Sequence, residues 1–198
     1  MNSKYQYLID LYNAIDSIEE DYCNWDYNDT IQKTERVFAY ELYFKLKIIS
    51  ILNPNRYENI KFNGEIGKKL QNINLNKLGT NLEFNQVDFN PDLVLHKNQI
   101  DYSPENQKLI IEIKTKNQTD ENIAKDILKL NYGIENLNFQ FGVFISVNTN
   151  FETIQNKIRR IFQIDLIDEN SRSNLEKIII INYENQILKS DSLANILK

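Results

Sequence analysis

The sequence predicts an α/β domain in which helices flank a mixed central β-sheet. Helical apolar stripes and short β-branched runs follow one another in the order helix, three strands, helix and strand. The run from Phe139 to Val147 is almost continuously apolar, as is typical of a central strand covered on both faces. No linker interrupts the 198 residues, so we expect one domain. Its expected parts are an N-terminal helix and link (1–29), an αβββαβ core (30–147) and a C-terminal helix and strand extension (148–198).

The N-terminal segment is predicted to form an amphipathic helix over residues 2–22. Its apolar side chains recur at helical spacing and its acids gather toward the end, which is typical of a helix packed on the core with a solvated acidic face. An irregular link follows up to Asp29, and in it Trp25 is expected to fill a packing position.

The second helix is predicted from about Thr30 to Leu52, where Asn53-Pro54 ends it. It carries two apolar stripes, so we expect little of its surface to face water. Glu41 lies within the first stripe, where an unpaired carboxylate costs several kcal/mol. We therefore expect Glu41 to be paired with a basic side chain, protonated or bound to a metal ion. The first stripe is Val37, Tyr40, Phe44, Ile48 and Ile51, and the second is Phe38, Leu42, Leu46 and Ile49.

Three strands follow this helix in the prediction. The first is a short strand at residues 59–66, and residues 67–90 then form a long loop, a kind of segment that is usually functional or disordered. The second and third strands, at residues 91–97 and 108–114, make a hairpin. Four charged side chains would lie near a site on this hairpin: Glu65 at the end of the first strand, and Lys68, Lys69 and Lys77 in the loop.

The C-terminal half continues with alternating helices and strands. A helix is predicted over residues 119–137, followed by the apolar strand already described. The pattern Thr149-x-x-Glu152 is typical of a capping box and predicts a helix that continues to Phe162. A last buried strand is predicted over residues 177–183 because Ile predominates there.

Composition restricts the kinds of site that the chain can hold. With one cysteine and one histidine, the chain offers neither an internal disulfide nor a multi-histidine or cysteine-based metal site, so any metal must be held by carboxylates. The net charge of −5 is uneven: residues 1–35 carry −6, and the remainder carries +1. The N-terminus lacks an apolar signal core and no apolar run approaches the ~20 residues of a membrane span. We expect a cytoplasmic protein without a membrane partner.

Two short motifs on the predicted hairpin point to chemistry. Pro91-Asp92 is the only Pro-Asp pair in the chain, and Glu112-Ile113-Lys114 is its only acidic-x-Lys triplet. In the second motif the period-2 rule places Glu112 and Lys114 on the same face of the strand. Two carboxylates on adjacent strands can share a hard cation such as Mg²⁺. Such a cation polarises a phosphoryl oxygen and acidifies a bound water, and a neighbouring lysine can orient that water.

With these motifs and this order of elements, residues 35–147 resemble the PD-(D/E)xK nuclease superfamily, which has the restriction-endonuclease-like fold. The resemblance implies a Mg²⁺- or Mn²⁺-dependent nuclease acting on DNA rather than RNA. It implies that Asp92, Glu112 and the backbone carbonyl of Ile113 bind metal and that Lys114 positions the attacking water. An acid on the helix before the sheet often joins such sites, and Glu41 matches that position. Lys129 is the polar residue expected from the following helix.

Other interpretations of the same residues remain open. A motif as short as this also arises on the solvated face of an ordinary strand, and the main alternative is a catalytically silent nuclease-fold subunit that binds within a larger nucleic-acid-processing or phage-defence complex. An RNA-directed nuclease would use the same chemistry. A homodimer or a protein partner is compatible with the sequence, although no interface is visible in it.

Overall fold

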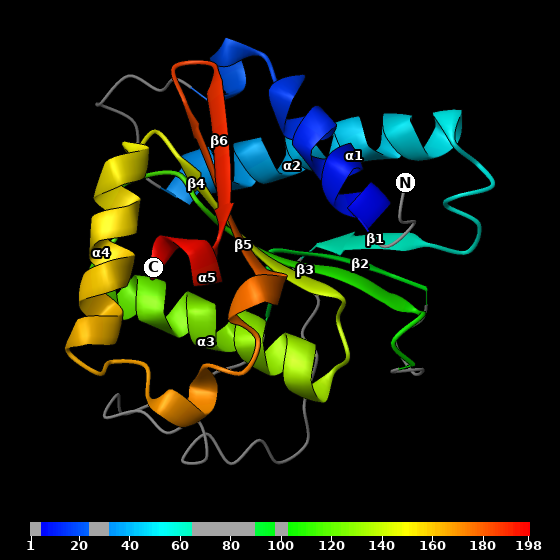
Figure 1. Cartoon of the computed structure of the whole chain (residues 1–198). Coiled ribbons are helices and arrows are strands. Elements are labelled where there is room, and N and C mark those ends of the chain that lie inside the picture. The colour runs from blue at the N-terminus through cyan, green and yellow to red at the C-terminus, as the bar shows by residue number, and fades with distance from the viewer. Residues whose placement is uncertain (1–4, 24–31, 65–89, 98–102) are drawn as a thin grey trace.

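The computed structural model describes residues 5–23, 32–64, 90–97 and 103–198, apart from the side chains of residues 32–34 and 170. These residues build a six-stranded mixed sheet with helices on both faces (Figure 1). The strands are β1 (Lys61–Gly64), β2 (Leu93–His96), β3 (Gln107–Lys114), β4 (Phe141–Val147), β5 (Ile178–Glu184) and β6 (Ile187–Ser192). The α-helices are α1 (Gln6–Asp16), α2 (Gln32–Leu52), α3 (Asp120–Asn136), α4 (Phe151–Gln163) and α5 (Leu193–Ile196).

The strands lie in the sheet in the same order as in the sequence. β1, β2 and β3 are antiparallel neighbours, whereas β3, β4 and β5 run parallel to one another and β6 closes the sheet antiparallel to β5. Parallel neighbours need a crossover, and α3 and α4 provide the two crossovers between these parallel strands. The predicted order of helix, three strands, helix and strand is confirmed by α2, β1, β2, β3, α3 and β4.

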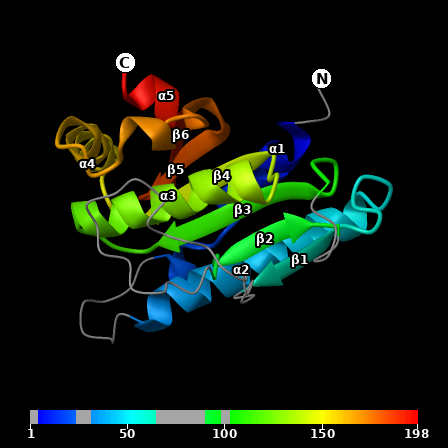
Figure 2. The ribbon, with the colours of Figure 1, turned by 90° about the horizontal axis from the view of Figure 1, so that it is seen from below.

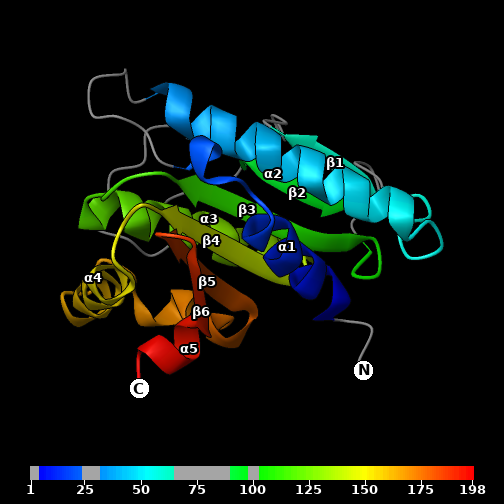
Figure 3. The same cartoon turned by 90° about the horizontal axis from the view of Figure 1, so that it is seen from above.

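Two apolar layers cover the sheet because the side chains of each strand alternate between its faces. Leu109, Ile111 and Ile113 of β3 pack against α1 and α2 on one face. Ile110 of β3 and Phe144 of β4 pack against α3 and α4 on the other face. Figure 3 shows α1 and α2 over the first face, and Figure 2 shows α3 over the opposite one. β3 and β4 are therefore buried on both sides, as the apolar run of β4 predicts.

The structure corrects several details of the sequence-based prediction. The first helix is shorter than predicted, and a 3₁₀ turn at Glu20–Tyr22 follows it. Asp10 of α1 is buried rather than solvated because Arg56 and the Tyr57 hydroxyl bind its Oδ2 at 2.5 and 2.8 Å. The side chain of Asn150 caps the start of α4, one residue after Thr149, which the sequence predicts as the cap.

The greatest difference concerns α2. The second apolar stripe is buried as expected, but Tyr40, Phe44, Ile48 and Ile51 of the first stripe are exposed, so the expectation that little of this helix faces water is wrong. β6 and α5 were not predicted at all. The described residues do not include Trp25, Glu65, Lys68, Lys69 and Lys77, nor the loop predicted at 67–90 apart from Asn90. The roles predicted for these residues therefore stay predictions. Among the helices that the structure describes, none is both long and apolar enough to cross a membrane.

Candidate functional site

Polar side chains gather where β2 begins and β3 continues past it. Asp92 directly precedes β2, and its Oδ2 accepts a hydrogen bond of 2.6 Å from the backbone N–H of Ile113 in β3. Leu93 pairs with Ile111 in the sheet, so Ile113 lies beyond the last β2–β3 pair and its N–H is free for this carboxylate. The hydrogen bond fixes Asp92 beside the Glu112-Ile113-Lys114 motif, and the two sequence motifs meet as predicted.

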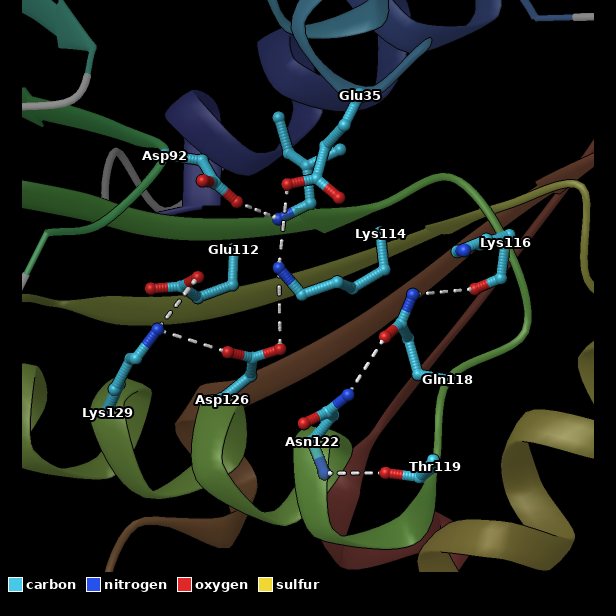
Figure 4. Close-up of polar contacts among 11 residues, drawn as sticks. Glu35, Asp92, Glu112, Lys114, Lys116, Gln118, Thr119, Asn122, Asp126 and Lys129 are labelled. Atoms are coloured by element: carbon cyan, nitrogen blue, oxygen red, sulfur yellow. Dashed lines mark hydrogen bonds and ion pairs between the residues drawn. The ribbon is translucent and has the colours of Figure 1, made fainter. Parts of the chain in front are cut away.

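The side chains of Glu112 and Lys114 project toward α3, where two further charged groups meet them (Figure 4). Lys129 Nζ lies 3.6 Å from Glu112 Oε2 and 3.2 Å from Asp126 Oδ1. Lys114 Nζ lies 3.6 Å from Asp126 Oδ2 and 3.7 Å from Glu35 Oε1 at the start of α2. The two lysines thus alternate with carboxylates from α2, α3 and the sheet.

The cluster contains four carboxylates and two lysines: Glu35, Asp92, Glu112, Asp126, Lys114 and Lys129. With every group ionised its net charge is −2. The Glu112 side chain is 2% exposed and that of Asp126 is 5% exposed, so water cannot compensate this charge well. Excess negative charge in a buried site is costly unless protons or cations neutralise it.

The pKa shifts in the cluster follow from burial and from the neighbouring charges. Burial raises the pKa of Glu112 well above its usual range, and the charge of Asp126 raises it further against the opposing effect of Lys129. Burial also raises the pKa of Asp92, although Lys114 and the Ile113 N–H act in the opposite direction.

The lysines show the complementary shift. Burial alone would lower the pKa of Lys114, but Asp126, Asp92, Glu35 and Glu112 together raise it. The pKa of Lys129 is likewise raised because Glu112 and Asp126 outweigh its burial. Both lysines are therefore protonated at neutral pH, and a protonated lysine here acts through its charge and its N–H donors.

The donor set fits a hard divalent cation in its chemistry. It supplies carboxylate oxygens, and Glu112 Oε1 is buried without a hydrogen-bond partner among the described residues. The N–H and C=O groups of one residue in a strand point to the same side of that strand. The Ile113 carbonyl therefore points to the side of β3 on which Asp92 lies. A charge of +2 would also balance the cluster. Within the described residues, however, no three acidic, histidine or cysteine side chains are already arranged around one ion. Lys129 pairs with Glu112 Oε2 and would compete there with a cation, whereas Glu112 Oε1 is open to one.

Glu41 lies elsewhere on α2. It forms an ion pair of 3.2 Å with Lys45 one turn along the helix. Pairing with a basic side chain is one of the three alternatives that the sequence offered for Glu41. Glu35, six residues earlier, is the α2 acid that contacts the cluster. Six residues rotate a helix by about 240° and advance it by about 9 Å, so the two carboxylates face different surroundings. The structure therefore places Glu35, rather than Glu41, in contact with the cluster.

Two members of the cluster, Glu35 and Asp126, were missed by the sequence interpretation. Asp126 had a visible signal: it lies three residues after Ile123 and four before Leu130, within the inward stripe of α3. Glu35 had none, because acids near a helix start are common for electrostatic reasons alone.

Basic residues and the histidine outside the cluster have structural partners. His96 is fully buried and its Nε2 lies 2.9 Å from Asn63 Nδ2, a contact that joins β2 to β1. Arg159 Nε donates to the Ile196 carbonyl at 2.9 Å, and Arg160 forms a two-pronged contact with Asp120.

Comparison of the chain with protein-family models, curated proteins and solved structures finds no match.

Proposed function

We propose that this protein is a metal-dependent nuclease of the PD-(D/E)xK type, with a restriction-endonuclease-like αβββαβ core, and that its substrate is DNA. One observation carries the proposal: Asp92, Glu112 and Lys114 meet near the end of β3 in a cluster whose net charge is −2 when every group is ionised. The order α2, β1, β2, β3, α3, β4 supports the fold assignment.

Each residue has a role that its position supports. Asp92 and Glu112 would hold Mg²⁺ or Mn²⁺ together with the Ile113 carbonyl, and Glu35 would approach from α2. The cation supplies Lewis-acid polarisation of the phosphodiester and acidification of water. Lys114 is protonated and held between Glu35 and Asp126, so its ammonium group can donate to an attacking water or to a phosphoryl oxygen. Asp126 positions both lysines and does not itself need to contact the substrate.

The first test is calorimetric titration of Mn²⁺ into the wild type and into the Asp92→Ala/Glu112→Ala double variant. We expect binding to the wild type alone. The titration is then repeated with Ca²⁺ in place of Mn²⁺ in the presence of a short DNA duplex that the wild type leaves uncut in Ca²⁺, because substrate phosphate is itself a metal ligand. Wild-type protein that binds neither Mn²⁺ alone nor Ca²⁺ with the duplex would contradict the metal site.

The second test measures Mg²⁺-dependent cleavage of DNA and RNA side by side. Asp92→Ala and Lys114→Ala should each lower the DNA cleavage rate at least about 100-fold with an unchanged fold by circular dichroism. Matched controls are Glu135→Ala on the exposed face of α3 and Lys189→Ala on β6, which should cleave like the wild type. Retained cleavage in either site variant would refute the assignment, and cleavage of RNA alone would move the substrate from DNA to RNA.

A second candidate is a nuclease-fold subunit that binds without cleaving. The observation that favours it is the ion pair between Lys129 and Glu112, which neutralises a proposed metal ligand from within the chain. The Lys129→Ala variant distinguishes the two. If Lys129 only competes with the cation, its removal should strengthen Mn²⁺ binding, whereas a silent subunit stays without cleavage in both forms.

A further inference from the structure

The outer surface of α2 carries a continuous apolar stripe that nothing in the proposed nuclease chemistry requires. Its members are 39% to 74% exposed and lie along about 18 Å of one helix. They are Tyr40, Phe44, Ile48, Ile51 and Leu52, and here we call them the α2 stripe. Phe44 lies about 180° around the helix from Glu35, so the stripe faces away from the charged cluster.

We propose that the α2 stripe is the interface of a homodimer, in which α2 packs antiparallel against α2 of a second copy. Exposed stripes of this size on a soluble domain mark interaction sites. The spacing of three and four residues is that of helices that pack along their length.

The exposed area is sufficient for such a dimer. With about 200 Å² for each aromatic side chain and somewhat less for each aliphatic one, the stripe offers roughly 500–600 Å² per copy. Two copies would bury about 1,000–1,200 Å² from the stripe alone, and flanking residues add to this. A specific interface begins at about 1,000 Å² in total, so a dimer closed by the α2 stripe reaches that size.

Charge selects a second copy in antiparallel orientation. Glu41 and Lys45 both lie on one flank of the stripe, about 60° and 100° around the helix from Phe44. A twofold axis perpendicular to the two helices brings the same flank of each copy together, running in opposite directions. When the pair is centred near Tyr43, Glu41 of one copy lies level with Lys45 of the other and the reverse contact forms at the same time, while Ile48 and Ile51 are covered by the first half of the partner's α2. The flank is thus complementary to itself.

The first test is the oligomeric state of the full chain by sedimentation velocity over a range of concentrations. We expect a wild-type dimer and an at least about 100-fold larger dissociation constant for Ile51→Glu, because the substituted residue occurs twice in the interface. Ile187→Glu on β6 is the matched control, since Ile187 is 56% exposed but lies off α2. A wild-type chain that stays monomeric, or equal effects of the two substitutions, would overturn the proposal.

The second test examines the orientation. Glu41→Lys and Lys45→Glu should each weaken the dimer, because each leaves one sign of charge facing itself across the axis. An equimolar mixture of the two variants should recover dimers, since opposite charges then meet between chains. Pairing within one chain cannot give this recovery. A mixture no more dimeric than its components would overturn the antiparallel arrangement.

Discussion

Substituting Glu112 by Gln should stabilise the protein in the absence of metal while removing its proposed metal site. The Glu112 side chain is 2% exposed in a cluster of net charge −2, so its ionised form lacks full compensation. Lys129 keeps its contact with Asp126 at 3.2 Å after the substitution, so no lysine is left unpaired. Replacement of buried ion pairs by neutral side chains of similar volume is often neutral or stabilising by about 1–4 kcal/mol, provided that no uncompensated charge is left behind. We expect a gain in this range on a total stability of about 5–15 kcal/mol.

The dependence of this gain on pH has a definite sign. Burial raises the pKa of Glu112 in the folded protein above its unfolded value of about 4.3. Between these two pKa values the folded protein binds more protons than the unfolded chain, so the free energy of unfolding falls as pH rises. The advantage of Glu112→Gln should therefore be small near pH 4 and reach its full size above the folded pKa.

Urea denaturation with EDTA, at several pH values and then with Mg²⁺, measures these effects. Mg²⁺ at 100 times its dissociation constant should stabilise the wild type by about 2.7 kcal/mol and leave Glu112→Gln unchanged. Glu135→Gln is the control, because Glu135 lies on the exposed face of α3 and its substitution should change the free energy of unfolding by no more than about 0.5 kcal/mol. A Glu112→Gln variant less stable than the wild type at pH 8 without metal would refute the reasoning, since Glu112 would then be a compensated structural ion-pair partner.

Three further predictions concern parts of the molecule outside the carboxylate cluster. Gly142→Ala would place a Cβ 2.9 Å from Leu130 Cβ, forcing α3 away from β4; we expect a loss of about 1–3 kcal/mol in urea denaturation, and an unchanged midpoint would contradict this packing. Cys23 is 4% exposed and burial raises the pKa of its thiol to about 12, so a disulfide reagent at pH 8 should label it only as fast as the protein unfolds. Hydrogen bonds from Arg160 lower the pKa of Asp120, so Asp120→Asn should cost some stability above pH 4 and none once pH falls below the folded pKa, as paired denaturation curves would show.

The sequence predicts those elements whose periodicity coincides with their burial. β4 is apolar at every position except Ser146 and is buried at every position, so its place at the centre of the sheet follows from the sequence alone. β6 has the sequence ILKSDS and lies half exposed at the edge of the sheet, where neither alternation nor apolar content marks a strand. Its pairing with β5 supplies the backbone hydrogen bonds, and such long-range pairing leaves no local signal.

The same limitation explains the site and α2. Asp92, Glu112 and Lys114 were predictable because strand alternation and adjacency in a hairpin bring them together. The sequence could not show that Glu41 pairs with Lys45, because two apolar stripes on one helix do not reveal which one faces the sheet. Only tertiary packing makes Phe38, rather than Phe44, the buried phenylalanine of α2.

α2 connects the two proposals while leaving them independent. Its start carries Glu35 into the charged cluster, and its second half carries the α2 stripe on the opposite side. All six residues of the charged cluster come from one chain, so a dimer contributes no ligand to it. In the antiparallel pair the two Glu35 residues lie about 24 Å apart along the helix direction, related by the twofold axis. Mn²⁺ binding per chain should therefore be the same in Ile51→Glu as in the wild type. A variant that loses both dimerisation and Mn²⁺ binding would show that the site depends on the second copy, contrary to the single-chain geometry.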